Sequence, residues 1–334
     1  MMEIVNNEYI KFFDKNIILE DIYNKDIHKL KIAIHIHLYY IDMLNIFINY
    51  LQESPINFDL FISVISEDNK NICLQNINNT SLQKLNKLYV KKVQNIGRDI
   101  SSFLIDFKDD WKRYDLVCHI HSKKSLHTKE IGRWSEYLFN NLISNDAITN
   151  ITSNFLLNDN LGVVFPPVFY MIYKWAINLH ESDEKKIIEL LNKLNINFIP
   201  NRENFIFSAG NMFWFRPKAL EKLFDLNITY DDIPKEPIEY DHTILHVLER
   251  LQCIIAEQSG FIIKSYISRK ELLNSFFERY DYITKIEQLN KEINDKKSEI
   301  IDIKLFKFIL FAIKKDAQYF KIIILGIHFI IKLK

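Results

Sequence analysis

Short apolar segments typical of β-strands alternate along this chain with segments whose apolar residues recur at helical spacing. KIAIHIHLYY predicts a first strand, and IDMLNIFINYLQES, which follows it, predicts a helix. FDLFISVIS predicts a second strand, SLQKLNKL a helix, and YVKKVQ a third strand. Such alternation is typical of a mostly parallel sheet covered by helices on both faces. We therefore expect an α/β fold with a Rossmann-like sheet.

The alternation continues toward the C-terminus. YDLVCHIHSKKS, residues 114–125, begins like a buried strand and ends in polar residues, and WSEYLFNNLI and AITNITSNFLL predict helices. LGVVFPP predicts a short strand, and residues 170–204 are expected to be helical. FIFSAGNMFWFRPKALEKLF predicts a strand and then a helix with Pro217 in its first turn, EYDHTILHVLERL a helix, and GFIIKSY a last strand. We expect residues 1–30 to be an N-terminal extension and residues 31–282 to form the main domain.

The overall charge gives no reason to expect a nucleic-acid partner. Lysine plus arginine and aspartate plus glutamate number 43 each among 334 residues, so the chain has no net field that would attract a polyanion. The three cysteines are far apart in the sequence, which is typical of reduced thiols in a cytoplasmic protein. The N-terminal residues lack the apolar core of a signal peptide. We expect a cytoplasmic location.

The character of the sequence changes at residue 283. Residues 304–334 carry seven lysines against one aspartate, and the apolar run Ile322 to Ile331 is too short to span a bilayer. We expect residues 283–334 to form a basic amphipathic helical tail that lies on an anionic membrane surface. This places the protein on the inner face of the cell membrane. The alternative is a C-terminal helix that packs on the domain or on another subunit.

Polar residues follow three of the predicted strands, in the stretches HLYY, SEDN and HSKKS. In open parallel sheets, ligands bind beyond the carboxyl ends of the strands. These three stretches are therefore the first place to expect a binding site.

Four motifs in this order, NIGRDISSFL, YDLVCHIHSKKS, SAGNMFWFRPKAL and EYDHTILHVLERL, resemble the rhamnan synthesis protein F group of bacterial glycosyltransferases, a branch of the GT-A fold. The resemblance runs from about Ile32 to about Tyr266 and includes HLYYIDM and LGVVFPP. It implies transfer of a sugar from a nucleotide-diphosphate donor to a growing cell-surface polysaccharide such as a capsule or O-antigen. The acceptor would be a lipid-linked or polysaccharide glycan, and dTDP-L-rhamnose is a candidate donor.

The resemblance gives the end of YDLVCHIHSKKS a role in binding the donor diphosphate. Most GT-A enzymes carry Asp-x-Asp here, which holds a divalent metal, whereas this chain has His121, Lys123 and then Lys124. Lysine and protonated histidine can supply the positive charge that the departing diphosphate needs. We therefore expect no metal ligands and no required cofactor, with Mg²⁺ or Mn²⁺ as the alternative. A solvated basic turn is the other interpretation.

The motif NIGRD predicts a phosphate contact directly after a strand. Gly97 permits a backbone turn that other residues resist, and Arg98 can make paired hydrogen bonds to phosphate. Asp99 could orient Arg98 or accept from the ribose or the sugar. The alternative is a turn with an ordinary surface Arg-Asp pair.

Further residues are candidates for nucleotide or sugar contacts. Tyr39 or Tyr40 could stack on the base, and Glu67 or Asp68 could accept from its imide or from the ribose hydroxyls. Gly210 stands where a side chain would obstruct a substrate. The tyrosines could equally belong to the edge of the core and the acids to a loop. The predicted nucleotide and sugar contacts also include three polar residues, His37, Asn95 and Asn211.

Asp241 matches the position at which inverting GT-A enzymes carry a general base. A carboxylate there would take the proton from the acceptor hydroxyl as it attacks the anomeric carbon. An aspartate just before a helix is also a favoured N-cap, and one residue could serve both roles.

Two pairs of histidines allow a different interpretation. His35 and His37 share one face of a strand, as do His119 and His121, so four imidazoles could converge on a transition metal. No cysteine or carboxylate completes a standard ligand spacing, so buried, hydrogen-bonded histidines are the preferred interpretation. A metal-dependent hydrolase and a catalytically silent nucleotide-sugar-binding scaffold are the alternatives to a transferase.

Overall fold

The computed structural model describes residues 17–18, 22–124, 133–169, 172, 176, 179–202, 205–235 and 242–274, together with three strands between residues 312 and 332. The expectations for Ser125 and Asp241 fall outside these ranges.

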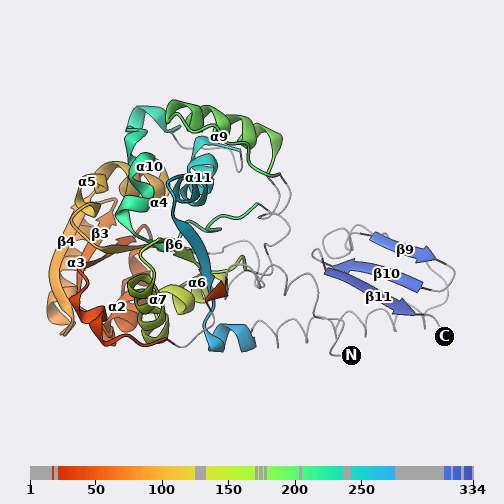
Figure 1. The fold of residues 1–334 in the computed structure, drawn as a ribbon. Helices are drawn as coiled ribbons and strands as arrows, with labels where there is room; N and C mark the ends of the chain where they lie inside the picture. The colour runs from red at the N-terminus through yellow and green to blue at the C-terminus, as the bar shows by residue number, and fades with distance from the viewer. Residues whose placement is uncertain are drawn as a thin grey trace, which may run out of the picture.

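The main body is built on one mostly parallel sheet (Figure 1). The spatial order of its strands is β1-β8-β6-β7-β5-β2-β3-β4, and only β7 runs antiparallel to its neighbours. This confirms the predicted α/β fold class with a Rossmann-like sheet. The strands are β1 (Ile17–Ile18), β2 (Ile32–His37), β3 (Phe58–Val64), β4 (Leu85–Lys92), β5 (Leu116–His121), β6 (Leu161–Phe165), β7 (Phe213–Phe215) and β8 (Ile262–Tyr266).

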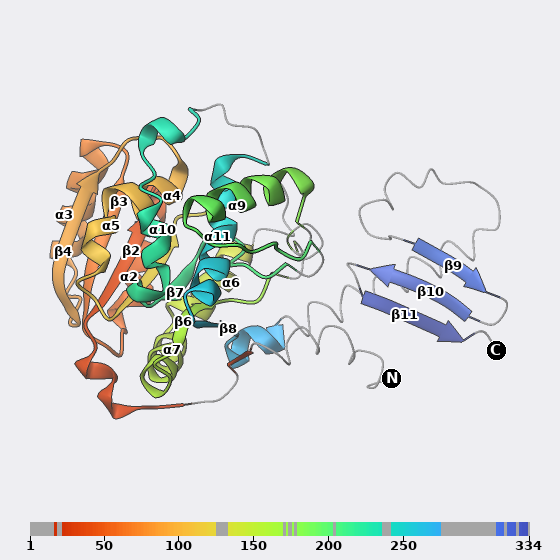
Figure 2. The same ribbon diagram turned by 45° about the horizontal axis from the view of Figure 1, so that its top comes forward.

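Helices cover both faces of this sheet and enclose two apolar cores (Figures 1 and 2). One face packs on α2 (Leu44–Gln52), α3 (Glu67–Asn79), α6 (Trp134–Leu142) and α7 (Asn145–Leu157). The other face packs on α4 (Arg98–Ser101), α5 (Lys108–Trp111), α9 (Glu181–Lys193), α10 (Glu221–Asp225) and α11 (Ile244–Gln258). Shorter turns are η1 (Lys25–Lys29), η2 (Ile41–Met43), η3 (Ser102–Asp106), η6 (Pro217–Leu220) and η7 (Tyr230–Asp232).

Strand β7 shows how the sequence feeds both cores. Side chains alternate between the two faces of a strand. Phe213 and Phe215 accordingly enter one core and Trp214 the other, and all three are fully buried. The aromatic run FWF is therefore core, which explains why it is uninterrupted by polar residues.

The order of the strands reverses between β2 and β5. From β2 the chain continues through β3 to the edge strand β4, whereas β5 lies on the opposite side of β2. The two central strands are parallel, and their register aligns His35 with His119 and His37 with His121. The expectation that the two histidine-bearing strands are neighbours is confirmed. Both strands end at the same edge of the sheet.

The predicted helix SLQKLNKL is wrong. The helix between β3 and β4 is α3, which begins earlier because the Ser66 side chain caps it by accepting from the backbone N–H of Asn69 at 3.1 Å. Residues 85–92 pair with β3 instead. Pairing along the sheet outweighs the weak helical spacing of three leucines.

The expected helical tail is also wrong where the structure describes it. Residues 312–332 form a separate antiparallel sheet of β9 (Ala312–Asp316), β10 (Tyr319–Ile324) and β11 (Ile327–Lys332). The segment is rich in isoleucine, whose branched Cβ favours strands over helices. Among the helices that the structure describes, none is both long and apolar enough to cross a membrane. Membrane contact stays a prediction.

Part of the expected N-terminal extension packs on the main body. Ile27 of η1 is buried, and η1 contacts α7. The backbone N–H groups of Ile22 and Asn24 donate to Asn150 Oδ1 and Ser153 Oγ at 2.9 and 3.0 Å. The segment before β2 therefore shares the apolar core of α7.

Candidate functional site

The carboxyl ends of β2 and β5 bring the sequence-predicted residues together. His37 and His121 are aligned neighbours at the last position of each strand, and both are almost fully buried. The Ser122 backbone N–H continues the pairing by donating to the carbonyl of His37 at 2.9 Å. This edge is also where the strand order reverses, which is the position at which α/β sheets bind ligands.

A buried hydrogen-bond network joins three of the four histidines. His35 and His119 face each other through their Nδ1 atoms at 2.8 Å. Ser63 Oγ lies 3.3 Å from His35 Nε2 and 2.9 Å from His37 Nδ1. The preferred interpretation of hydrogen-bonded core histidines is confirmed. Across the described parts of the chain, no three His, Cys, Asp or Glu side chains are grouped so as to hold a metal.

These three imidazoles are neutral at pH 7. Burial lowers the pKa of His35 and of His119, and it lowers the pKa of His37 to about 4. Neighbouring imidazoles add to the effect because two positive charges would repel each other. Positive charge at this edge must therefore come from other residues.

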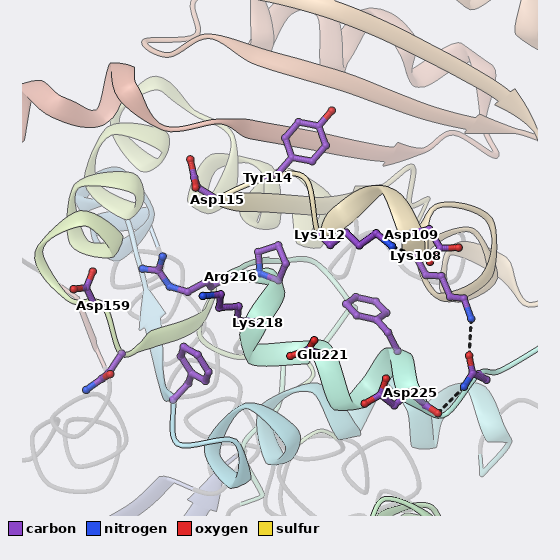
Figure 3. A pocket seen from close by; sticks show the side chains of 15 residues that line it. Lys108, Asp109, Lys112, Tyr114, Asp115, Asp159, Arg216, Lys218, Glu221 and Asp225 are labelled. Carbon is purple, nitrogen blue, oxygen red and sulfur yellow. Dashed lines mark hydrogen bonds and ion pairs between the residues drawn. The ribbon is translucent and has the colours of Figure 1, made fainter.

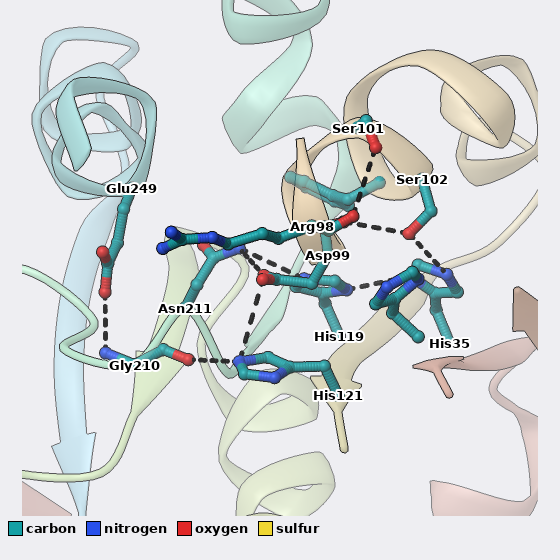
Figure 4. Close-up of polar contacts among 12 residues, drawn as sticks. His35, Arg98, Asp99, Ser101, Ser102, His119, His121, Gly210, Asn211 and Glu249 are labelled. Atoms are coloured by element: carbon teal, nitrogen blue, oxygen red, sulfur yellow. Dashed lines mark hydrogen bonds and ion pairs between the residues drawn. The ribbon is translucent and has the colours of Figure 1, made fainter. Parts of the chain in front are cut away.

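Asp99 is the anionic centre of the site (Figure 4). Its Oδ2 accepts from the Asn211 side-chain amide and lies 3.5 Å from His119 Nε2 and 3.9 Å from His121 Nε2. Burial acts to raise the pKa of this carboxyl, but the two imidazoles and the amide outweigh burial and hold the pKa well below its usual value. The carboxylate is thus ionised and bound within the protein. In this structure it organises the imidazoles and Asn211.

Gly97 sets the start of α4 and hence the place of Asp99. Its φ is +79°, and a Cβ atom there would lie 2.9 Å from Ile233 Cδ1. Both the backbone conformation and the packing require glycine, which confirms the predicted turn. The next residue, Arg98, is exposed, and its side chain extends past Asn211 toward the side on which Glu249 lies (Figure 4).

Lys123 lies over the indole ring of Trp134 on α6. Its Nζ lies 3.9 Å from the centre of the Trp134 ring. Burial lowers the pKa of Lys123, the carboxylates of Glu249 and Asp99 act to raise it, and the positive charge of Arg98 lowers it further. Lys123 is therefore within electrostatic reach of both Arg98 and Glu249.

Lys124 points toward η2. Its Nζ donates to the Asp42 carboxylate and lies 4.9 Å from the centre of the Tyr40 ring. The hydrogen bond from Lys124 lowers the pKa of Asp42. The two lysines thus diverge, one toward α6 and one toward η2.

The structure requires glycine at position 210 for a reason that differs from the predicted one. Its φ is +96°, and a Cβ atom there would lie 3.2 Å from Leu138 Cδ1 and from Trp134 Cζ2. Protein side chains therefore border the space that the expectation assigned to a substrate. The carbonyl of Gly210 accepts from His121 Nε2 at 2.8 Å, and its N–H donates to Glu249 Oε1 at 2.7 Å.

Asn211 has protein partners at both ends of its amide. Its Nδ2 donates to Asp99, and its Oδ1 accepts from the Gln252 side chain on α11. Asn211 therefore fastens α4 to α11. Sequence reasoning missed three residues here, Trp134, Glu249 and Gln252, because each sits in a helical segment that reads as ordinary amphipathic sequence.

The remaining candidates lie along the same edge of the sheet. Tyr39 and Tyr40 follow β2. Tyr39 is 41% exposed, and its ring packs edge-on against the Tyr40 ring with the two ring centres 4.9 Å apart. Glu67 and Asp68 are exposed in the first turn of α3, after β3, and Asn95 is exposed after β4. The edge therefore gathers them, and their contacts with a nucleotide stay predictions.

The capping role considered for Asp241 belongs to another residue. Thr243 is the N-cap of α11, and its side chain is 3.0 Å from His246 Nδ1 in a capping box. Next to Asp241, His242 has a φ of +62°, and its Nδ1 is 3.2 Å from both carboxylate oxygens of the buried Asp183. Asp241 itself lies outside the described residues, so its role as a base stays a prediction.

A hollow of about 860 Å³ lies at the opposite edge of the sheet (Figure 3). Its walls include Tyr114 and Asp115 before β5, Asp159 before β6 and Phe261 before β8. These are the amino ends of parallel strands. The hollow is therefore distinct from the site formed by Arg98, Asp99 and Lys123.

The fold and the geometry define an α/β protein with a candidate site at the switch point of its sheet, where a buried carboxylate and several cationic side chains lie near one another. The family model for rhamnan synthesis protein F matches residues 1–261, and the chain belongs to that family.

Two curated relatives are both named uncharacterized protein WxcX, from two strains of Xanthomonas campestris pv. campestris. Each is 24% identical over 172 residues, which make up 51% of this chain and 24% of the relative. The chain thus spans about a quarter of the length of the curated relatives it matches. Among solved structures, the mannosyltransferase PcManGT from Pyrobaculum calidifontis, in complex with GDP-Man and Mn²⁺, is 8% identical with a TM-score of 0.42. That match covers 77% of this chain and 59% of the mannosyltransferase.

Proposed function

We propose that this protein transfers a sugar from a nucleotide-diphosphate donor to a growing polysaccharide, with inversion at the anomeric carbon. The observation that carries the proposal is the placement of Arg98 and Lys123 after the carboxyl ends of β4 and β5, with Lys123 within electrostatic reach of Arg98, Glu249 and Asp99. A site of this charge suits a diphosphate joined to a polar sugar. Family membership supports the same conclusion.

Arg98 and Lys123 would bind the diphosphate and stabilise the negative charge that it gains when the glycosidic bond breaks. Lys124 could join them once it leaves Asp42. His121 has a different task, because its Nε2 donates to the carbonyl of Gly210 and its Nδ1 lies 3.3 Å from the carbonyl of Ser122. It would hold Gly210 and the neighbouring Glu249 in place. Asp241 would take the proton of the acceptor hydroxyl.

We further propose a lipid-linked or polysaccharide glycan as acceptor and a cytoplasmic location at the inner face of the cell membrane. The lysine-rich segment 304–334 would contact the anionic surface. We propose that the reaction requires no metal cofactor.

The test is isothermal titration calorimetry with UDP, dTDP, GDP and CMP, first with excess EDTA and then with Mn²⁺. Tight binding of one diphosphate in EDTA would support cationic replacement of the metal site and would identify the donor base. Binding only with Mn²⁺ would show that acidic groups hold a metal and would contradict the metal-independent part. Absence of binding in both conditions would contradict both the transferase and the nucleotide-sugar-binding scaffold.

Transferase and scaffold also differ in their response to Asp241→Asn. The transferase requires this change to abolish sugar transfer while the thermal unfolding midpoint is kept. A scaffold would leave glycan assembly intact. A stoichiometric zinc content of the purified protein would support the hydrolase instead.

A further inference from the structure

Trp134 borders the candidate site from α6. It is half-buried, and it stands at the first position of the helix that follows the stretch beginning HSKKS. The edge of its indole packs against Gly210, where a Cβ atom would lie 3.2 Å from Cζ2. Gly210 in turn is held by His121 and Glu249. The indole is therefore fixed to the same backbone that positions two residues of the site.

Lys123 covers the face of this indole. Its Nζ lies 3.9 Å from the ring centre, which is a close cation–π distance. Such a contact is stronger where water is excluded, and burial lowers the pKa of this lysine. The ammonium group is also within electrostatic reach of Arg98, Glu249 and Asp99, so the ring face that it covers lies near the charged residues of the site.

The indole N–H of Trp134 is a second indication that a ligand binds here, because it lacks a hydrogen-bond partner among the described residues. Trp134 Nε1 is shielded from solvent and has no hydrogen-bond acceptor among the described residues. A buried donor without an acceptor is unfavourable. Because this N–H bond lies in the plane of the ring, a ligand hydroxyl could accept from it only at the edge of the ring.

We propose that Trp134 is the contact surface for the sugar ring of the donor, and that Lys123 covers this surface until a diphosphate draws the ammonium group away. This inference rests on the proposed function. A charge-assisted hydrogen bond to phosphate is stronger than a contact with a neutral ring, so binding of the diphosphate uncovers the indole. The C–H groups on one face of a pyranose then pack on the exposed ring, while its hydroxyl groups remain available to Arg98 and Glu249.

The first experiment compares a nucleotide with its sugar derivative: UDP with UDP-glucose, dTDP with dTDP-glucose, and GDP with GDP-mannose. Calorimetry on the full chain gives the ratio of the two affinities for the unaltered protein and for Trp134→Leu and Trp134→Phe. We expect Trp134→Leu to lower the affinity for the nucleotide sugar by about three- to tenfold, which is the effect of losing one aromatic contact. The nucleoside diphosphate alone should keep its affinity or bind more tightly, because the ring no longer competes for Lys123. Trp134→Phe should retain most of the sugar contribution.

The second experiment follows the indole directly. The chain has four tryptophans, of which Trp111 and Trp214 are fully buried in the two cores. The measurement is made in a Trp175→Phe background, so that a change of tryptophan fluorescence on addition of the nucleoside diphosphate should come from the uncovered Trp134. Trp134→Phe should lose this change while it still binds the diphosphate. If Trp134→Leu leaves the ratio of the nucleotide-sugar affinity to the nucleoside-diphosphate affinity unaltered, at an unchanged unfolding midpoint, the proposed sugar contact is wrong. If the unaltered protein binds none of the six nucleotides, the proposed function itself fails.

Discussion

His35 and His119 meet through their Nδ1 atoms at 2.8 Å in the middle of the sheet, where both side chains are fully buried. Burial keeps both rings neutral. One of the two nitrogens must therefore carry a hydrogen and the other must accept it. The pair links the Ser63 hydroxyl on β3 to the Asp99 carboxylate on α4. It thereby joins the two halves of the sheet on either side of the switch point.

This pair should be coupled in stability. His119→Phe or His35→Phe alone leaves a buried nitrogen without its partner, which should lower the free energy of unfolding by about 1–3 kcal/mol. The double variant should lose less than the sum of the two single variants, because no orphaned nitrogen remains. Urea unfolding of the four proteins measures the coupling. Strict additivity would show that the Nδ1–Nδ1 contact contributes nothing.

Stability should fall as the pH is lowered from 7 toward 4. The pKa of His37 is about 4 in the folded protein against an ordinary value of 6.5, so the unfolded chain binds more protons between these values. The contribution of His37 to the free energy of unfolding is therefore fully present above pH 6.5 and is lost as the pH falls toward 4. Its loss at pH 5 should be about 2 kcal/mol, and His35 and His119 act in the same direction. Urea midpoints from pH 7 to pH 5 measure the slope, and His37→Phe should flatten it.

Gly210 offers a test of how much the site depends on one backbone position. Gly210→Ala forces a Cβ atom into a left-handed conformation and against Leu138 and Trp134. Gly260→Ala is the matched control, since its φ is +84° and no atom lies within 4 Å of the new Cβ. The control should lose only the conformational contribution, about 1–2 kcal/mol. Thermal or urea unfolding should show a larger loss for Gly210→Ala, and equal losses would mean that the packing around Trp134 is unimportant.

Lys123→Ala should weaken binding of a nucleoside diphosphate by tenfold or more, because a partly buried ammonium group contributes a charge-assisted hydrogen bond to phosphate of about 1.5–3 kcal/mol. Arg98→Ala should act in the same direction. Lys218→Ala is the control, since Lys218 lies in the hollow at the opposite edge of the sheet. Calorimetry at two salt concentrations separates a specific contact from general charge. Equal effects of Lys123→Ala and Lys218→Ala would move the diphosphate away from the carboxyl edge.

The sequence by itself determined the repeating pattern and the edge of the sheet at which the site lies. Short apolar runs rich in β-branched residues, such as KIAIHIH and LVCHIH, favour buried parallel strands, and their polar ends indicate the carboxyl edge of the sheet. Gly97 could be assigned to a turn because a positive φ is a local property of the backbone. These features depend on residues that are adjacent in the sequence, so they can be predicted without the tertiary structure.

Only the tertiary structure decided which side chains meet. Asn211 bonds to Asp99 across 112 positions, and Gly210 bonds to His121 across 89 positions. Trp134 and Glu249 lie in helices whose sequences are also compatible with plain packing, and they join the site because β5, β7 and α11 converge there. Residues 85–92 became a strand for the same kind of reason, since backbone pairing with β3 outweighs a weak local helical preference. Contacts between distant segments fix these choices, and no local pattern records them.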